Sequence, residues 1–496
     1  MKIKNNIGSE DVNLVMTNAL ESFQTYKNVP GKERASFLNH IADEIDKISS
    51  ELVKIAGEET NLSQARLNGE LKRTTIQLKM FAALLMEGSW VEAAIDTADK
   101  TRTPAKSDIR KMLQPVGPVI VFGASNFPFA FSTAGGDTAS ALASGSTIVI
   151  KGHSAHSKTS ELVFTAIQKA IRTSKMPEYT VQHVLGPGNS IGKALVLHPA
   201  AAGVGFTGSF LAGKALVEYA SSRDVPIPVF AEMSSINPAV FLPDALDKHA
   251  VALSNTFAGS ITLGVGQFCT NPGLLIMLES NKTDHFLALL SEEIYKVFPQ
   301  KMLHTGIAQS YSKNANRMLE QKGVKVITHA SEHVEDLLAH PILAKVKANE
   351  FLINPILQEE VFGPFSLIVV CNNKNELKLV LSQLKGQLTT TILATEEDIR
   401  LHRDIIDMQT ALAGRIILNE VPTGVEVCAS MVHGGPYPAT TDSRFTSVGT
   451  TAIKRWVRPV CLQGFTDALL PDALKDANPL GIWRLINNEF TKGPAN

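Results

Sequence analysis

Cys269 lies in the decapeptide GVGQFCTNPG (264–273), in which three glycines and a proline predict an irregular backbone. A thiol in a loop, close to backbone N–H groups, has a lowered pKa and acts as a nucleophile. For cysteines in general, a role as a small buried apolar residue is the more common one, and the decapeptide alone does not exclude it. The other cysteines, Cys371, Cys428 and Cys461, are widely spaced and form no CxxC pair. This spacing disfavours a disulfide framework and a zinc site, and it predicts a reducing compartment and no metal ligand set.

Two further polar residues follow short apolar runs. Asn126 stands in VFGASNFPF, and Glu232 stands in PVFAEMSSINP. Ligands of α/β proteins bind at the carboxyl edge of the sheet, so an amide and a carboxylate at strand ends are candidates for catalysis. Taken alone, Asn126 fits a turn and Glu232 fits a helix cap. The number of residues between Glu232 and Cys269 does not by itself show whether the two act together.

The segment VGFTGSFLAGKAL places Gly208 and Ser209 between an apolar run and a helical pattern. The free N–H groups of a helix N-terminus bind a pyrophosphate, although Gly-Ser is also an ordinary helix start. No GxGxxG fingerprint follows the first apolar run of this region, so an ordinary Rossmann dinucleotide site is not indicated.

The elements that must position these residues alternate between strands and helices. One apolar stripe with spacings of three and four predicts a core-facing helix after VPG; its residues are Leu38, Ile41, Ile45, Ile48, Leu52 and Ile55. From residue 116 onward, short apolar runs alternate with helical patterns, which predicts βαβ units and parallel sheets covered on both faces. The predicted strands of two α/β domains, joined near residue 233, are VGPVIVF, STIVI, TVQHV, AGVGF and IPVFAEM, then GLLIML, SLIVVC, TTTILA and GRIILN. Predicted helices of the second domain are 281–296, 373–385 and 396–412.

The overall composition excludes several classes of protein. The 496-residue chain carries 47 basic and 48 acidic residues, so no net field favours a nucleic acid or an anionic membrane. No uninterrupted apolar stretch reaches about 18 residues, which predicts no membrane span. The first residues have no apolar h-region, which disfavours a secretory signal and favours a cytoplasmic protein.

Taken together and in this order, SNFP, FTGS, the strand-end Glu232, GQFC and EEVFGP (359–364) resemble the aldehyde dehydrogenase superfamily, over most of the chain. The resemblance implies an α/β fold with two parallel-sheet domains and a small oligomerisation arm. The implied divisions are a dinucleotide-binding domain (1–96 and 114–232), a catalytic domain (233–425), an oligomerisation arm with the C-terminal segment (97–113 and 454–496), and a return to the cofactor domain with a substrate loop (426–453). A homodimer or homotetramer is implied as well.

The resemblance also implies three catalytic roles. Cys269 attacks the aldehyde, and Asn126 with the backbone N–H of Cys269 binds the oxyanion. After hydride transfer, Glu232 activates the water that hydrolyses the thioester. A CoA-acylating relative is disfavoured because Glu232 is present. From another class, a catalytically silent nucleotide-binding homologue is disfavoured because all three residues are present.

The implied cofactor contacts are Lys151 at the adenosine ribose or its phosphate, Gly208 and Ser209 at the pyrophosphate, Glu360 at the nicotinamide ribose and Phe362 beside the ring. Many NAD-preferring members carry a glutamate where this chain has Ser154. The serine removes a charge that repels a 2′-phosphate, so we expect NADP to be preferred and NAD to be accepted. His153 and His156 are expected at the surface. The chain also departs from the family pattern at Phe210, and at Ser234 and Ser235 after Glu232.

Within the superfamily, KGHSAHS, GQFCTNPG, PTGVEV and MVHGGPYPATTDSRFTSVG resemble the α-ketoglutaric semialdehyde dehydrogenases, and the bacterial fatty aldehyde dehydrogenases share much of this wording. The first group implies oxidation of 2,5-dioxopentanoate to 2-oxoglutarate, with a cation for the distal carboxylate. The candidate cations are Arg73 and Arg444. The second group implies an apolar tunnel, for which Phe127 and Phe131 are candidates.

Overall fold

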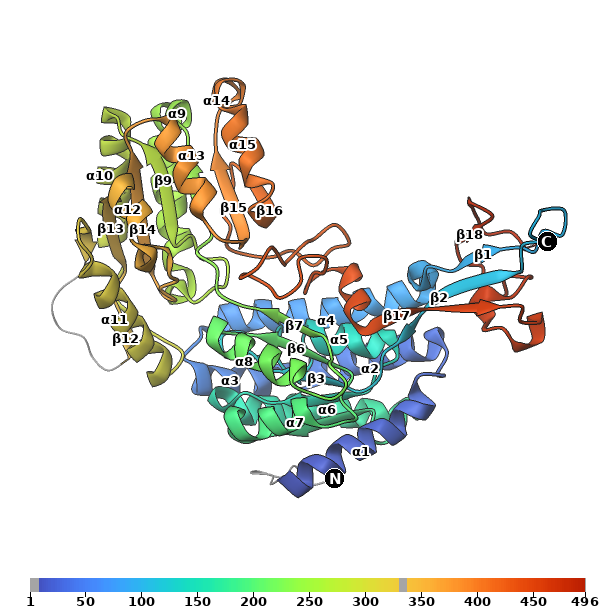
Figure 1. Cartoon of the computed structure of the whole chain (residues 1–496). Coiled ribbons are helices and arrows are strands. Elements are labelled where there is room, and N and C mark those ends of the chain that lie inside the picture. Colours follow the sequence, from blue (N-terminus) through green and yellow to red (C-terminus); the bar gives the residue numbers. More distant parts are fainter. Residues whose placement is uncertain (1–8, 330–336, 496) are drawn as a thin grey trace.

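The computed structural model describes residues 9–329 and 337–495. Two α/β units, each built on its own sheet, lie beside each other, and a small sheet projects from the first (Figure 1). The predicted fold class, two parallel-sheet domains with an additional arm, is therefore confirmed.

The first unit contains five parallel strands in the order β5-β4-β3-β6-β7. Every residue of β3, β4 and β5 is buried, as expected for a sheet that is covered on both faces. The bounds are β3 (Val119–Phe122), β4 (Ile148–Lys151), β5 (Val181–Val184), β6 (Gly203–Thr207) and β7 (Val229–Glu232). Lys151 and Glu232 are thus the last residues of β4 and β7.

Helices cover both faces of this sheet. One face packs against the hydrophobic core formed with α2, α4, α5 and α6, and the other against α1, α7 and α8. The bounds are α1 (Ser9–Tyr26), α2 (Gly31–Lys47), α3 (Ser49–Thr60), α4 (Gln64–Glu87), α5 (Gly136–Ser144), α6 (Ser157–Thr173), α7 (Lys193–Leu197) and α8 (Phe210–Ser221). The stripe that predicted one helix is divided between α2 and α3, because Ile48 leaves the helical region at φ −112° and ψ 18°.

The second unit contains seven strands in the order β11-β13-β14-β9-β8-β15-β16, and only β11 pairs antiparallel. The bounds are β8 (Ala239–Phe241), β9 (Leu274–Leu278), β11 (Lys325–His329), β13 (Ile342–Lys347), β14 (Phe365–Cys371), β15 (Gln387–Leu393) and β16 (Ala413–Leu418). The apolar runs of the second domain correctly predicted β9, β14, β15 and β16. No predicted strand corresponds to β8, β11 or β13.

One face of this sheet packs against α9 (Pro243–Thr262) and α10 (Asn281–Tyr295). The other face packs against α11 (Thr305–Leu319), α12 (Ala348–Ile353), α13 (Lys374–Gln383) and α15 (Arg403–Gln409). The helix predicted over 396–412 is divided into α14 (Glu396–Leu401) and α15, with His402 between them at φ −124°. Two short strands, β10 (Gln300–Lys301) and β12 (Leu338–Ala339), pair beside this unit.

The arm is a five-stranded sheet in the order β17-β2-β1-β18-β19. Its bounds are β1 (Ala94–Asp96), β2 (Ile109–Pro115), β17 (Val457–Gln463), β18 (Arg484–Ile486) and β19 (Glu489–Thr491). RWVRPVCLQGF supplies β17, which pairs antiparallel with β2 of the same chain. No helix in the described residues is long and apolar enough to cross a membrane.

The segment between β16 and β17 returns from the second sheet to the first. It runs along β7, where the Met233 N–H donates to the Ala439 carbonyl and Glu232 bridges to Thr440. This contact joins the middle of the chain to a segment about 200 residues later, beside the last residue of β7. It therefore brings the 433–447 stretch next to Glu232.

Candidate active site

Cys269 lies in the loop between α9 and β9, at the junction of the two units. Gly264, Val265 and Gly266 all adopt positive φ and turn the chain sharply before it. A Cβ on Gly266 would lie 2.3 Å from the carbonyl of Gly363, so only glycine allows this close approach. The Asn237 side chain donates to the Cys269 carbonyl at 2.9 Å. The backbone of Cys269 is therefore fixed while its side chain stays partly exposed.

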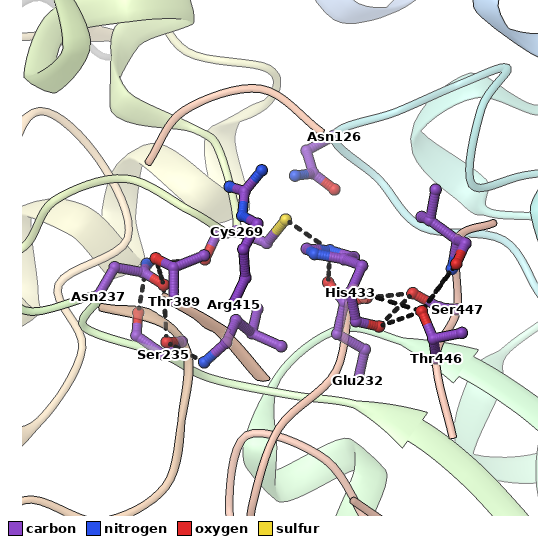
Figure 2. A network of polar contacts seen from close by, with 12 residues as sticks. Asn126, Glu232, Ser235, Asn237, Cys269, Thr389, Arg415, His433, Thr446 and Ser447 are labelled. Atoms are coloured by element: carbon purple, nitrogen blue, oxygen red, sulfur yellow. Dashed lines mark hydrogen bonds and ion pairs between the residues drawn. The ribbon is translucent and has the colours of Figure 1, made fainter. Parts of the chain in front are cut away.

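His433 is the residue that sequence reasoning missed. Its Nε2 lies 3.5 Å from Cys269 Sγ and 3.0 Å from Glu232 Oε1, so the ring stands between the thiol and the carboxylate (Figure 2). The Thr446 hydroxyl accepts from the His433 N–H at 2.8 Å and fixes the backbone there. The only sequence signal was a histidine in MVHGG, inside a motif quoted for the resemblance.

Glu232 is buried at the end of β7 and is held by three groups. Ser447 Oγ donates to its Oε2 at 3.0 Å, His433 contacts Oε1, and the Cys269 thiol donates to the carboxylate. Burial raises the pKa of Glu232, but the charge of His433 and these hydrogen bonds lower it further, so the net pKa lies below its ordinary value. The buried Glu232 is therefore ionised.

The Cys269 thiol is protonated in this arrangement. Burial and the adjacent Glu232 charge raise its pKa well above the ordinary value, while Arg73 acts in the opposite direction. The expectation of a lowered pKa from the loop backbone is wrong, because the nearest charge is a carboxylate. A nucleophilic thiolate must then form by transfer of its proton to the adjacent base.

Asn126 lies beside Cys269, where Figure 2 shows its side-chain amide next to the sulfur. Its Nδ2 donates to the Gln267 carbonyl at 3.2 Å, two residues before Cys269. Arg66 Nη2 donates to the Asn126 carbonyl at 2.7 Å and holds this turn in place. The structure thus brings together all three residues for which a catalytic role was predicted.

Three arginines surround this centre. Arg66 and Arg73 are seven residues apart on α4 and so lie on one face of the helix, and Arg415 lies on β16. Burial lowers the pKa of each guanidinium, and the charge of Cys269 acts in the opposite direction on all three, which places each in the field of the thiol. Within residues 9–329 and 337–495, none of these three forms an ion pair with a carboxylate.

Glu70 stands between Arg66 and Arg73 on the same helix face, and its charge acts to raise the pKa of both, but among the described residues it forms no ion pair with either. Its Oε1 accepts from the N–H groups of Phe129 and Ala130 at 2.8 and 3.0 Å. Burial raises the pKa of Glu70 above its ordinary value. Buried N–H groups of both arginines consequently have no partner among the described residues, including Nη1 and Nη2 of Arg73.

Aromatic rings separate these cations from one another. Arg66 stacks on the rings of Phe127 and Phe268, at 5.0 and 4.4 Å from the ring centres. Arg73 stacks on Phe131 at 5.2 Å, and Phe131 in turn contacts the ring of His433. Phe127 and Phe131 therefore lie where the substrate interpretation predicts apolar groups.

Arg444 is not part of this group. Its side chain is 80% exposed and forms an ion pair with Asp442 at 2.5 Å. An exposed, paired arginine contributes little to the recognition of a buried ligand. Of the two candidate cations for a distal carboxylate, the structure places only Arg73 beside Cys269.

The predicted cofactor residues follow the carboxyl edge of the first sheet. Lys151 ends β4, is buried, and has no ion pair among the described residues; burial lowers its pKa. Ser154 is exposed three residues later. Gly208 and Ser209 are exposed at the start of α8, where Ser209 Oγ accepts from the Ala212 N–H at 3.4 Å.

His153 and His156 differ from the expectation of surface histidines. His156 is fully buried, and its Nε2 contacts the Ala124 carbonyl at 2.8 Å. Burial lowers the pKa of His153 to about 3, with the charges of His156 and Lys151 acting in the same direction. Both rings are therefore neutral near pH 7 and add no positive charge beside Ser154.

Glu360 and Phe362 line a small pocket with Ser235 and Phe268, one residue from Cys269. Burial raises the pKa of Glu360 to about 7, although hydrogen bonds from the Ser234 side chain and the Ser235 backbone lower it. Ser234 and Ser235, at which the chain departs from the family pattern, thus both favour the ionised form of Glu360. A buried lysine at β4, an open helix start at α8 and this pocket together fit a nicotinamide dinucleotide.

Comparison with known proteins agrees with this geometry. Residues 3–437 match the model of the aldehyde dehydrogenase family. Alpha-ketoglutaric semialdehyde dehydrogenase 2 of Azospirillum brasilense is 47% identical over 96% of this chain and 91% of its own length. Alpha-ketoglutaric semialdehyde dehydrogenase of Acinetobacter baylyi is 45% identical over 97% of this chain and 92% of its own.

Solved structures show the same fold at lower identity. Glyceraldehyde-3-phosphate dehydrogenase GapN of Methanocaldococcus jannaschii, complexed with NADP, superposes with a TM-score of 0.78 at 19% identity, over 93% of this chain and 95% of its own. A 3,6-anhydro-L-galactose dehydrogenase structure gives the same TM-score over 92% of each chain. The chain belongs to the aldehyde dehydrogenase family and is an NAD(P)-dependent aldehyde dehydrogenase.

Proposed function

We propose that the enzyme oxidises α-ketoglutaric semialdehyde to 2-oxoglutarate, with NADP preferred over NAD. The names of the two relatives above 40% identity support this substrate. The observation that carries the proposal is Arg73, whose two terminal nitrogens are buried without a hydrogen-bond partner among the described residues and whose charge acts on Cys269. A planar guanidinium binds a carboxylate through two parallel hydrogen bonds, and α-ketoglutaric semialdehyde has a carboxylate at the end distant from its aldehyde.

In the first step, the Cys269 thiol loses its proton and its sulfur attacks the aldehyde carbon. Glu232 is the ionised base in contact with the thiol, and His433 lies between the two groups and carries the proton between them. The product is a thiohemiacetal, whose oxyanion accepts hydrogen bonds from the Asn126 amide and the Cys269 N–H.

The bound nicotinamide cofactor supplies a hydride acceptor, which Lys151, Gly208, Ser209, Glu360 and Phe362 would hold. Loss of hydride from the thiohemiacetal leaves a thioester on Cys269. Once Glu232 has released the proton from Cys269 to solvent, it removes a proton from water, whose oxygen attacks the thioester carbon, and the Cys269 sulfur leaves as a thiolate. Retention of this buried carboxylate favours hydrolysis over transfer to another thiol.

The preference for NADP depends on the residues at the end of β4. Lys151 is a buried cation without an ion-pair partner in the described residues, and Ser154 is exposed three residues away. A 2′-phosphate would meet one cation and one hydroxyl there and no carboxylate at position 154. NAD lacks the phosphate and would lose only this contact. For assembly, we infer a homodimer or homotetramer in which the five-stranded arm contacts another subunit.

Arg73→Met tests the substrate, and Arg444→Met is the matched control because Arg444 is exposed and paired with Asp442. We expect Arg73→Met to lower kcat/KM for α-ketoglutaric semialdehyde by about 10- to 100-fold, as loss of a charge-assisted bond pair predicts. Pentanal, which has the same number of carbons and no carboxylate, should lose less kcat/KM than the semialdehyde, because only the effect of the Arg73 charge on the Cys269 thiol is removed. Arg444→Met should leave both substrates unaffected.

A fatty aldehyde dehydrogenase is the second candidate, and the rings of Phe127, Phe131 and Phe268 beside the centre favour it. A wild-type kcat/KM that rises with aldehyde chain length and exceeds that for the semialdehyde would overturn the proposal in favour of this candidate. Equal losses on both substrates in Arg73→Met would assign Arg73 a purely structural role. Failure of Cys269→Ala to abolish formation of reduced cofactor would refute the covalent mechanism.

A further inference from the structure

The catalytic group also has the composition and spacing of a metal site. Cys269 Sγ, His433 Nε2 and a carboxylate oxygen of Glu232 all lie within 4.8 Å of one another. Each offers one donor atom of a different type: a thiol sulfur, an imidazole nitrogen and a carboxylate oxygen. The side chains of His433 and Glu232 are 1% and 3% exposed, whereas Cys269 is partly exposed. The opening at Cys269 leaves one side of the group accessible.

The distances fit tetrahedral coordination of zinc closely. With Zn–S near 2.3 Å and Zn–N near 2.0 Å, ligand atoms at tetrahedral angles lie about 3.5 Å apart for sulfur and nitrogen, and about 3.4 Å apart for nitrogen and oxygen. The observed separations are 3.5 Å for Cys269 Sγ to His433 Nε2, and 3.0 Å for His433 Nε2 to Glu232 Oε1. The third separation, from Cys269 Sγ to the Glu232 carboxylate, is within 4.8 Å, so a shift of these side chains toward a shared cation would complete the geometry.

We propose that this group binds a thiophilic divalent cation such as Zn²⁺ and that the bound cation inhibits the enzyme reversibly. Three protein ligands and one open position describe the site. On binding, the Cys269 S–H bond breaks, its sulfur pair coordinates the cation and the proton passes to solvent, so no oxidant or reductant takes part. The occupied site has no free nucleophile and no free base. Inhibition is consequently competitive with the aldehyde and independent of which aldehyde is used.

The remaining cysteines make a clean measurement possible. Cys428 and Cys461 are exposed and would bind a thiophilic metal unspecifically, whereas Cys371 is fully buried in β14. The double variant Cys428→Ser, Cys461→Ser therefore retains Cys269 as its accessible thiol. Co²⁺ is the probe, because coordination by a thiolate produces a near-ultraviolet charge-transfer band that the free ion lacks.

We expect the double variant to bind one Co²⁺ per chain with this band, and Zn²⁺ to displace it. Adding Cys269→Ser should remove the band, and adding His433→Gln or Glu232→Gln should weaken binding by at least about tenfold. Circular dichroism shows whether each variant is folded, and two independent ligand variants keep the test decisive if one is not. Zn²⁺ should slow oxidation of both pentanal and the semialdehyde, and EDTA should restore the rate.

Three outcomes would overturn the inference. The first is absence of the charge-transfer band in the double variant. The second is a band that persists unchanged in both His433→Gln and Glu232→Gln, which would mean binding by the thiol alone. The third is Zn²⁺ inhibition that persists when saturating aldehyde is present. None of these outcomes bears on the substrate, so the proposed function stands or fails separately.

Discussion

Replacing His433 tests whether this residue transfers a proton or only holds Glu232 and Cys269 in place. His433→Phe keeps a planar ring beside Phe131 but removes both contacts of Nε2, at 3.5 Å to Cys269 and 3.0 Å to Glu232. His433→Gln keeps an N–H donor for Glu232 but cannot accept and release a proton at neutral pH. The pair of variants thus distinguishes support of the carboxylate from transfer of a proton.

The expected magnitudes follow from what each variant leaves behind. In His433→Phe, the buried Glu232 keeps Ser447 and the Cys269 thiol but loses its contact with His433 Nε2, and a buried polar atom left without its partner costs about 1–3 kcal/mol of stability. Loss of a positioned acid–base group costs about 10²- to 10⁴-fold in rate. We therefore expect both variants to lose activity by that factor. Only His433→Phe should also lose the stability given above.

The assays are urea denaturation for stability, and single-turnover formation of reduced nicotinamide for thiolate attack and hydride loss. The rate of Cys269 alkylation by iodoacetamide reports thiolate formation without the cofactor, and it should fall in both variants. A kcat/KM for His433→Gln within roughly threefold of wild type would refute the role as proton carrier. In that case, His433 would only hold Glu232 in place.

Three further changes test other parts of the structure. Arg455→Met leaves Asp137, which pairs with Arg455 at 2.7 Å, buried and without this partner. The free energy of unfolding, measured by urea denaturation, should fall by about 3–5 kcal/mol. A fall below about 1 kcal/mol would contradict an energetically important buried pair. Gly266→Ala places a Cβ 2.3 Å from the backbone of Gly363, so the loop that carries Glu360 must shift. The KM for the cofactor should therefore rise. An unchanged KM would show that the clash is relieved without moving Glu360. The pKa of Glu360 is raised to about 7, so the folded state favours its protonated form. The resulting stabilisation is complete below the unfolded pKa of about 4.5 and is lost as the pH rises through 7. Glu360→Gln should flatten the stability–pH curve over this interval, and parallel curves for the two proteins would contradict the shift.

The sequence alone determined much of the secondary structure, because buried parallel strands are short apolar runs with clear boundaries. VIVF in β3 and LIVVC in β14 are examples, because nearly every residue of such a strand is buried and the apolar pattern is therefore continuous and local. β8 and β13 were missed for local reasons as well. β8 has three residues, and β13 (ILAKVK) carries two lysines that break the apolar run.

The sequence did not predict where a helix ends inside a continuous apolar stripe. Ile48 continues the apolar spacing of α2 into α3, yet its backbone leaves the helical region. Periodicity records which residues face the core, and it records no change in the direction of the helix axis. The same holds at His402 between α14 and α15.

Cys269, Glu232 and Asn126 were recognised as candidates from the sequence because each has a local context, a glycine-rich loop or a strand end, and because family motifs occur in order. His433 has no such context. Its contacts reach 164 residues back to Cys269 and 201 residues back to Glu232, and they exist because the segment after β16 returns along β7. Likewise, the sequence gives no reason to prefer Arg73 or Arg444 as the cation for the distal carboxylate. Only the tertiary structure decides between them, since it buries Arg73 near the thiol with no ion-pair partner among the described residues and leaves Arg444 in solvent with Asp442. Charge recognition depends on desolvation and on partners, and both are properties of the folded chain.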